Sequence, residues 1–533
     1  MTANEITAGA GVIQNPILPG FNPDPCLLRA GNLYYIAVSS FEWLPGVRVY
    51  VSSNLADWEH CTDILTHQVD LRGNPKNCSI WAPQLSYHDG LFYLLYTDVK
   101  STKRPFKDCH NYLISAPSIH GPWSEPIYLN SSGFDPSLFH DDDGRKWLLN
   151  CLWDYRITEG NKSSGIVIQE FDPRLGRLVG EPRKLFDGTP LKKTEAPHIY
   201  KHNGYYYLIT AEGGTGSGHA VTVARSKELL GPYEVDPMNP MLTSRNDPEL
   251  PLQCAGHGSL VRTPGGEWYM AHLCTRPVDG QYAILGRETA LQQVYWDEQG
   301  WLRLSAGGNV PQLKVPLPGG VSVTVKGMST DFEDDFAGPG LKKNWNTLRI
   351  PADESWCSLT ARKGYLRIQA GESVQSLFRH HVLAIRQTDQ SFRAETRVEF
   401  SPVSYLQMAG LMLYLNEDNY RYACVSQEEG RGKVLRLMCC ERDEFELELN
   451  AVELKGTGTV DLAVDVHGTD GRFFYREDDE EAWRPLGTTR NMGFLSGGFT
   501  GNFIGIAAHD MNRFGGCHAD FAYFRYQGRD RHS

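Results

Sequence analysis

The sequence has no run of apolar residues long enough to cross a membrane. A membrane-spanning helix needs about 18 or more consecutive apolar residues, and no window of the chain reaches that length. Residues 1–15 also lack the basic start and the hydrophobic stretch of a secretory signal. We therefore expect no membrane association and a cytoplasmic location.

Runs of basic residues are also missing. The 52 Lys and Arg are outnumbered by 64 Asp and Glu, so the net charge is −12. Binding to nucleic acid phosphates requires a basic surface. This composition argues against a nucleic acid partner and favours a neutral substrate.

The 12 cysteines show no CxxC spacing, and the adjacent Cys439 and Cys440 cannot easily form a disulfide with each other. Zinc sites and disulfide frameworks depend on regular cysteine spacings. We expect free thiols in a reducing compartment.

Long amphipathic helical patterns are absent as well. Residues 16–310 alternate short β-rich runs, such as 33–38 and 205–209, with Gly, Asp, Asn and Pro turns. A chain of 533 residues is too long for one core, and the Pro and Gly residues of 315–330 are typical of a connector. We predict one domain over residues 1–320 and a second, a β-sandwich, over residues 321–533.

One short pattern occurs five times in the first 270 residues. Each copy has a helix-breaking start, an apolar alternation, a turn, and a Gly followed three positions later by an aromatic residue. The copies start at Asp24-Pro25, Ala82-Pro83, Asp135-Pro136, Ala196-Pro197 and Gly258-Ser259. A hairpin-based period of about 50 to 60 residues predicts a five-bladed β-propeller with one blade per copy.

Acidic residues stand at the start of three of these copies. Asp before Pro usually only begins a turn, and the chain has such pairs at Asp24, Asp135, Asp172, Asp236 and Asp247. Only Asp24 and Asp135 share the phase of the repeat, and Glu195 lies one position earlier in its own copy. Equivalent positions of a propeller converge on its channel, so we expect these three acids to meet.

Three clustered acids suit glycoside hydrolysis. That reaction needs one protonated carboxyl group to donate to the leaving oxygen and one ionised carboxylate to activate water or attack the sugar. A third carboxylate raises the pKa of the acid. The same cluster also fits a calcium site, or a catalytically silent sugar-binding protein.

Four motifs carry a resemblance to a known family. They are Asn22-Pro23-Asp24-Pro25, Ser79-Ile80-Trp81-Ala82-Pro83, Gly133-Phe134-Asp135-Pro136 and Thr194-Glu195-Ala196-Pro197-His198. With them the chain resembles glycoside hydrolase family 43, and most closely its two-domain β-xylosidases, over nearly its whole length. The resemblance implies an all-β fold in which a five-bladed propeller is followed by a C-terminal sandwich of the jelly-roll, concanavalin-like kind.

The resemblance also implies an activity and roles for the acids. Asp24 is expected to be the general base, Glu195 the general acid, and Asp135 the residue that tunes and orients the acid. Such an enzyme inverts configuration and releases single xylose units from the non-reducing ends of β-1,4-xylo-oligosaccharides. An additional or main α-L-arabinofuranosidase activity is left open. No cofactor is required, and a dimer or tetramer is expected.

Five further residues match substrate-binding positions of the family: Arg287, Trp81, Phe41, His257 and Phe503. Thr215 lies in the glycine-rich run 213–218, which we interpret as a flexible pocket loop, and is expected to contact the sugar. Arg287 could instead form a surface ion pair, and Trp81 could serve blade packing. His257 could be a core histidine or lie beside a Ca²⁺ ion. Phe503, in the run 499–505, is expected to close the pocket from the second domain.

A second enzymatic interpretation is a fructan-processing five-bladed propeller with a retaining pair of carboxylates. Such enzymes typically carry an Arg-Asp-Pro motif. The chain has only Arg245-Asn246-Asp247-Pro248, so this interpretation is the weaker one.

Overall fold

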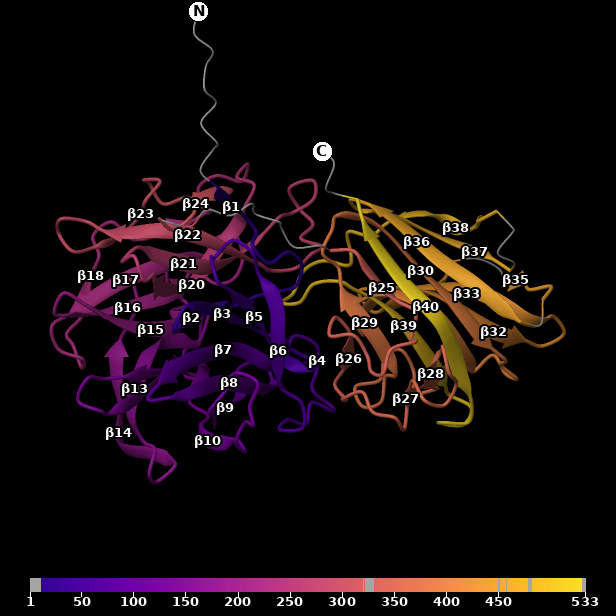
Figure 1. Cartoon of the computed structure of the whole chain (residues 1–533), viewed down its shortest axis with the longest axis horizontal. Coiled ribbons are helices and arrows are strands. Elements are labelled where there is room, and N and C mark those ends of the chain that lie inside the picture. The colour runs from indigo at the N-terminus through magenta and orange to yellow at the C-terminus, as the bar shows by residue number, and fades with distance from the viewer. Residues whose placement is uncertain are drawn as a thin grey trace, which may run out of the picture.

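The computed structural model describes residues 11–319, 321, 330–448, 451–456, 458–477 and 482–529. Across these ranges the fold is all-β, as predicted, and contains no α-helix, hence none that could cross a membrane. Figure 1 shows two bodies side by side, a propeller coloured indigo to magenta and a sandwich coloured orange to yellow. All 12 cysteines are free thiols.

Five sheets of four or five strands form the blades in the described part of the chain. The first blade has β2 (Cys26–Ala30), β3 (Leu33–Val38), β5 (Gly46–Ser52) and β6 (Glu59–Leu65), and the second has β7 (Ser79–His88), β8 (Leu91–Ser101), β9 (Asp108–Ala116) and β10 (Ile127–Asn130). The third has β11 (Gly133–His140), β12 (Lys146–Trp153), β13 (Ser163–Asp172) and β14 (Arg177–Phe186). The fourth has β15 (Glu195–His202), β16 (Tyr205–Glu212), β17 (Ala220–Ser226), β18 (Glu234–Val235) and β19 (Leu242–Thr243). The fifth has β20 (Gln253–Arg262), β21 (Trp268–Thr275), β22 (Glu288–Trp296) and β23 (Leu302–Leu304).

The start of each blade repeats one uncommon backbone feature. A non-glycine residue has left-handed φ at Asp24 (55°), Ala82 (39°), Asp135 (55°), Ala196 (51°) and His257 (55°). Side chains other than glycine seldom adopt this conformation, and here Pro or Gly always follows. The pairing of β7, β11, β15 and β20 with the next strand shifts register at this place. In the first four blades the left-handed residue opens the sequence copy, whereas in the fifth it is His257, one position before the predicted start at Gly258. With this correction, the sequence repeat is also a repeat of local strand geometry.

The two ends of the propeller domain are joined by pairing. Strand β1 (Val12–Gln14) pairs antiparallel with β24 (Lys314–Pro316). Asn15 donates from Nδ2 to the carbonyl of Leu291 in the fifth blade at 2.7 Å. This closure fixes the position of the segment that leads into Asp24.

The second body consists of two packed antiparallel sheets. One contains β25 (Phe332–Asp334), β27 (Cys357–Ser358), β28 (Leu366–Gln369), β30 (Ser391–Phe400), β36 (Thr459–His467), β37 (Asp470–Arg476), β38 (Arg484–Asn491) and β40 (His518–Gly528). The other contains β26 (Asn346–Leu348), β29 (Val382–Arg386), β31 (Gln407–Asn416), β32 (Asn419–Glu428), β33 (Gly432–Glu441), β34 (Glu444–Leu447), β35 (Val452–Glu453) and β39 (Phe503–Asp510). A large buried apolar cluster fills the space between them.

A short strand of the propeller domain completes the second sandwich sheet. Strand β4 (Trp43–Leu44), which lies between β3 and β5 in the chain, pairs with β26. Trp43 stacks on Phe503 with ring centres 3.7 Å apart, inside an apolar cluster shared by both domains. This contact holds the loop before β39 against the propeller.

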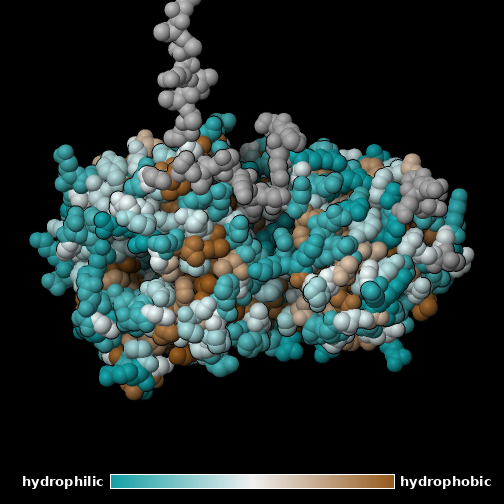
Figure 2. All heavy atoms as spheres, viewed as in Figure 1, coloured by the Kyte–Doolittle hydropathy of each residue, from teal (hydrophilic) through white to brown (hydrophobic). Residues whose placement is uncertain are grey.

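The predicted domain boundary lies at residues 320 and 321. Residue 320 is outside the described residues, and the flanking strands are β24 and β25. The boundary therefore stays a prediction. The surface seen in Figure 2 is largely hydrophilic, with small separate groups of hydrophobic residues.

Candidate active site

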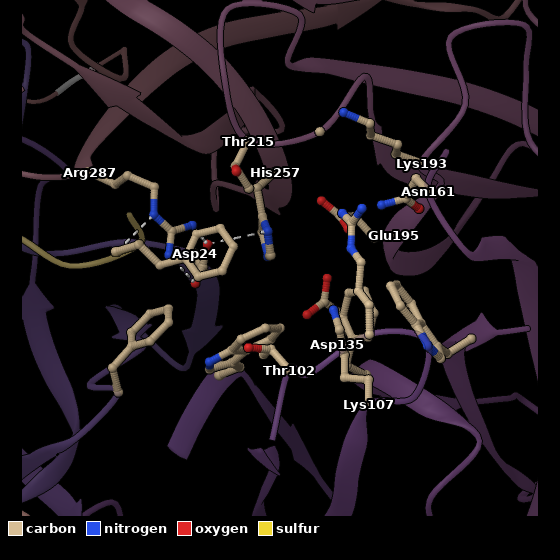
Figure 3. A pocket seen from close by; sticks show the side chains of 17 residues that line it. Asp24, Thr102, Lys107, Asp135, Asn161, Lys193, Glu195, Thr215, His257 and Arg287 are labelled. Atoms are coloured by element: carbon tan, nitrogen blue, oxygen red, sulfur yellow. Dashed lines mark hydrogen bonds and ion pairs between the residues drawn. The ribbon is translucent and has the colours of Figure 1, made fainter. Parts of the chain in front are cut away.

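A cavity of about 430 Å³ lies at the channel of the propeller. Every blade and the sandwich contribute to its lining. Of the nine predicted site residues, it brings together eight: Asp24, Phe41, Trp81, Asp135, Glu195, Thr215, His257 and Arg287. Figure 3 shows Asp24 and Arg287 on one side of the cavity, Asp135 and Glu195 on the other, and His257 between them.

The repeated backbone feature explains this convergence. Asp24, Asp135 and His257 are themselves the left-handed residues of the first, third and fifth blades. Glu195 immediately precedes the left-handed residue of the fourth blade, as Trp81 does in the second. All five side chains line the cavity, so each repeat directs a side chain into the channel from the left-handed residue or from the residue before it.

Asp24 is held by positive and hydrogen-bonding partners. Arg287 donates from Nη1 to Oδ1 at 2.5 Å, and the hydroxyl of Ser39 donates to Oδ2 at 2.6 Å. Nδ1 of His257 lies 3.6 Å from Oδ1. Burial alone would raise the pKa of Asp24, but Arg287, His257 and these hydrogen bonds outweigh it and lower the pKa below its ordinary value. Asp24 is therefore ionised at neutral pH.

Asp135 and Glu195 have the opposite electrostatics. Burial raises the pKa of Asp135 well above its ordinary value, and the charges of Glu195 and Asp24 raise it further. Burial likewise raises the pKa of Glu195 to about 7, although Lys107 opposes that shift. Oδ2 of Asp135 accepts from the backbone N–H of Ala196 at 3.1 Å, which ties it to the residue after Glu195. This pair retains a proton at a pH where Asp24 has none.

Lys107 is a cavity residue that the sequence analysis missed. Its Nζ lies 4.9, 4.1 and 4.2 Å from the ring centres of Trp81, Phe134 and Trp153. Such cation–π contacts fix the ammonium group at the side of the cavity where Asp135 and Glu195 lie (Figure 3). The loop between β8 and β9 that carries Lys107 has no motif, so the sequence offered no signal for it.

The aromatic wall is built around Phe41. Its ring centre lies 5.8 Å from that of Trp81 and 6.1 Å from that of Phe499. Arg287 donates from Nε to the carbonyl of Phe499 at 3.1 Å, and its side chain is only 7 % exposed. The interpretation of Arg287 as a surface ion pair is therefore wrong, because its partner Asp24 is a buried cavity residue.

The prediction that Phe503 closes the cavity is wrong. Phe503 begins β39, is fully buried and stacks on Trp43 in the apolar cluster between the domains. The sandwich residue that lines the cavity is Phe499. A signal for this was available, because Gly497, Gly498 and Gly501 mark Phe499 as a loop residue, whereas residues 503–508 form a short apolar run that is typical of a buried strand.

The residues around His257 do not fit a calcium ion. Calcium takes six to eight oxygen ligands, whereas Asp24 beside His257 is bonded to Arg287 and Ser39. In the ranges described above, no three His, Cys, Asp or Glu side chains gather in a way that could hold a metal ion.

Comparisons with known proteins identify the family to which both parts of the chain are similar. Residues 13–302 match the family model of glycosyl hydrolases family 43, and residues 333–527 match the β-xylosidase C-terminal concanavalin A-like domain. The chain is 44% identical to the xylosidase/arabinosidase 43B of Humicola insolens, with 97% of each chain covered. It is 44% identical to a β-xylosidase of Bacillus subtilis, covering 97% of this chain and 99% of the relative. The crystal structure of a xylan β-1,4-xylosidase from Bacillus halodurans is 48% identical, with a TM-score of 0.94 over 97% of this chain and 100% of that one.

Proposed function

Because this chain belongs to glycosyl hydrolase family 43, we propose that it is an inverting, exo-acting β-xylosidase. It would release single xylose units from the non-reducing ends of β-1,4-xylo-oligosaccharides. The observation that carries the proposal is the opposite electrostatics of the acids that face one another across the cavity, with the pKa of Asp24 lowered and those of Asp135 and Glu195 raised. A water-activating base and a protonated acid are the two groups that inverting hydrolysis needs.

In the proposed reaction, Asp24 takes a proton from a water molecule, whose oxygen attacks the anomeric carbon of the terminal xylose. The bond between that carbon and the glycosidic oxygen breaks as Glu195 donates its proton to the departing oxygen. Asp135, bonded to the backbone beside Glu195, keeps the acid oriented, while burial and the charge of Asp24 raise the pKa of Glu195. Arg287 holds Asp24 in place and in its ionised form.

The position of Phe499 supports exo-action. Its ring stands 5.4 Å from that of Trp81 and 6.1 Å from that of Phe41, and all three line the cavity. A wall contributed by the second domain limits the space beyond the terminal sugar, so a chain end fits better than a chain interior.

Release of α-L-arabinofuranosides is proposed as a side activity. A relative with 44% identity carries both activities in its name, and the two sugars share hydroxyl geometry. The cytoplasmic location, a dimer or tetramer, and independence from cofactors stay predictions.

The test is hydrolysis of nitrophenyl β-xyloside and xylobiose by the purified protein. Glu195→Ala and Asp24→Ala should each lower kcat by several orders of magnitude. Asp172→Ala, which alters an Asp-Pro pair outside the cavity, should leave it unchanged. Proton NMR should show α-xylose as the first product. Formation of β-xylose first would contradict inversion, and tight binding of xylobiose without cleavage would favour a sugar-binding protein.

A further inference from the structure

Two exposed aromatic residues lie next to the rim of the cavity. Phe106, in the loop between β8 and β9, is 58% exposed, and Tyr155, in the loop between β12 and β13, is 56% exposed. Their ring centres are 5.3 Å apart. Phe106 precedes the cavity residue Lys107, and Tyr155 follows the cavity residue Trp153 by two positions. The pair therefore continues the aromatic lining outward into solvent.

The two loops are joined to each other and to the cavity wall. Trp153 donates from Nε1 to the carbonyl of Pro105 at 3.1 Å, and its ring centre lies 4.2 Å from Nζ of Lys107. These contacts connect the residues adjoining Phe106 to the strand end that leads to Tyr155. The contacts of Trp153 with Pro105 and Lys107 therefore position the two loops that carry the exposed rings of Phe106 and Tyr155.

The loop that carries Tyr155 is braced internally. The backbone N–H of Asp154 donates to the carbonyl of Lys162 at 2.8 Å, and the Lys162 ammonium donates to the carbonyl of Ile157. Arg156 forms an ion pair with Asp154 at 2.8 Å. A surface that is ordered before binding loses less conformational entropy when a ligand arrives.

Phe106 and Tyr155 lie on the same side of the cavity as Glu195. This is the side on which the leaving part of the substrate is expected to bind. Lys107 and Asn161 lie beside Glu195 and Asp135, across the cavity from Asp24 and Arg287 (Figure 3). In the proposed reaction Glu195 protonates the oxygen of the departing sugar, so the rest of the oligosaccharide leaves the cavity on this side. The loops of Phe106 and Tyr155 border that exit.

We propose that Phe106 and Tyr155 form an aromatic platform that binds the third xylose of a xylo-oligosaccharide. The inference rests on the proposed function. Exposed aromatic faces favour a ligand with an apolar face and polar edges, and β-linked xylose offers axial C–H groups on both faces of its ring because its oxygen substituents are equatorial. Arg104 and Asn161, which line the cavity nearby, supply donors for its hydroxyl groups.

The test compares substrates that differ in length. Xylobiose is too short to reach a third site, whereas xylotetraose spans it. Phe106→Ala and Tyr155→Ala should each lower kcat/KM for xylotetraose by about threefold to tenfold, through KM, with xylobiose unchanged. Phe106→Tyr and Tyr155→Phe keep a ring in place and should restore the wild-type ratio between the two substrates.

A matched control is Phe445→Ala, because Phe445 is 57% exposed on β34 of the sandwich. It should leave both values of kcat/KM unchanged. If Phe106→Ala and Tyr155→Ala change the ratio no more than this control does, the platform does not exist. If the wild-type protein hydrolyses neither xylobiose nor nitrophenyl β-xyloside, the proposed function itself fails. Normal xylobiose hydrolysis by the variants shows that they are folded.

Discussion

Arg287 and Asp24 form a buried ion pair in which Nη1 lies 2.5 Å from Oδ1. The two residues are 263 positions apart in the chain, and their contact depends on closure of the fifth blade onto the first. Strand β22 begins at the next residue, Glu288, whose carboxylate accepts from the backbone N–H of Gly20 at 2.9 Å. The segment that carries Asp24 is thereby fixed to the blade that carries Arg287.

Arg287→Met should weaken the base and change its titration. Without the guanidinium, the pKa of Asp24 rises because burial is no longer outweighed. The acidic limb of the kcat/KM profile should move to higher pH, and kcat should fall about 10²- to 10³-fold, as when one charge-stabilising donor is lost. Arg287→Lys keeps the charge and should shift the limb less. An acidic limb that does not move in Arg287→Met would contradict the role assigned to this pair.

Lys107→Met should move the alkaline limb of the pH profile of kcat/KM. The ammonium lowers the pKa of Glu195 against the larger effect of burial, so its removal lets that pKa rise. Glu195 then keeps its proton to higher pH, and the alkaline limb of kcat/KM should move upward. Lys103→Met, an exposed change in the same loop, is the control and should leave the profile unchanged. An alkaline limb that moves to lower pH in Lys107→Met would show that Lys107 does not lower the pKa of Glu195.

Phe499→Ala and Phe503→Ala remove the same side chain from two positions of one run and should have different effects. Phe499→Ala opens the cavity wall and should lower kcat/KM for xylobiose about tenfold at nearly unchanged stability. Phe503→Ala leaves a void beside Trp43 in the interdomain cluster and should cost about 3–5 kcal/mol of stability. Kinetics below the melting temperature and thermal unfolding separate the two. Equal effects on both measurements would contradict these assignments.

The site residues that the sequence predicted correctly are mainly those that belong to the five-fold repeat. Asp24 and Asp135 share one phase of the blades, which corresponds to a left-handed residue before Pro, and Glu195 lies one position before that residue in its own blade. Because the repeat fixes local strand geometry, it also fixes which side chains reach the channel. This is why three acids distant in the sequence could be ranked above the Asp-Pro pairs at Asp172 and Asp236.

The residues that were missed depend on contacts between irregular segments. Lys107 reaches the acids because three aromatic rings from two blades surround it, and no local pattern encodes that enclosure. Strand β4 has only two residues, and its partner strand β26 lies about 300 residues further along the chain. Phe499 was missed for a different reason: the motif located only the run 499–505, and the glycines that mark Phe499 as a loop residue were not used to separate it from Phe503.

Glu195→Gln should stabilise the protein at alkaline pH while abolishing activity. Burial raises the pKa of Glu195 from 4.5 to about 7 in the folded state, so the native protein favours the protonated form. The stability associated with that proton is complete below about pH 4.5 and is lost as pH rises through about 7. Gln resembles the protonated acid and cannot ionise. The variant and the wild type should therefore unfold at similar temperatures at pH 5, and the variant should be more stable at pH 8, by up to about 3 kcal/mol.

Glu181→Gln, at an exposed position of β14, is the control, and its stability relative to the wild type should not change between pH 5 and pH 8. A stability difference between Glu195→Gln and the wild type that is constant from pH 5 to pH 8 would mean that Glu195 is ionised throughout this range, and it could then not serve as the acid.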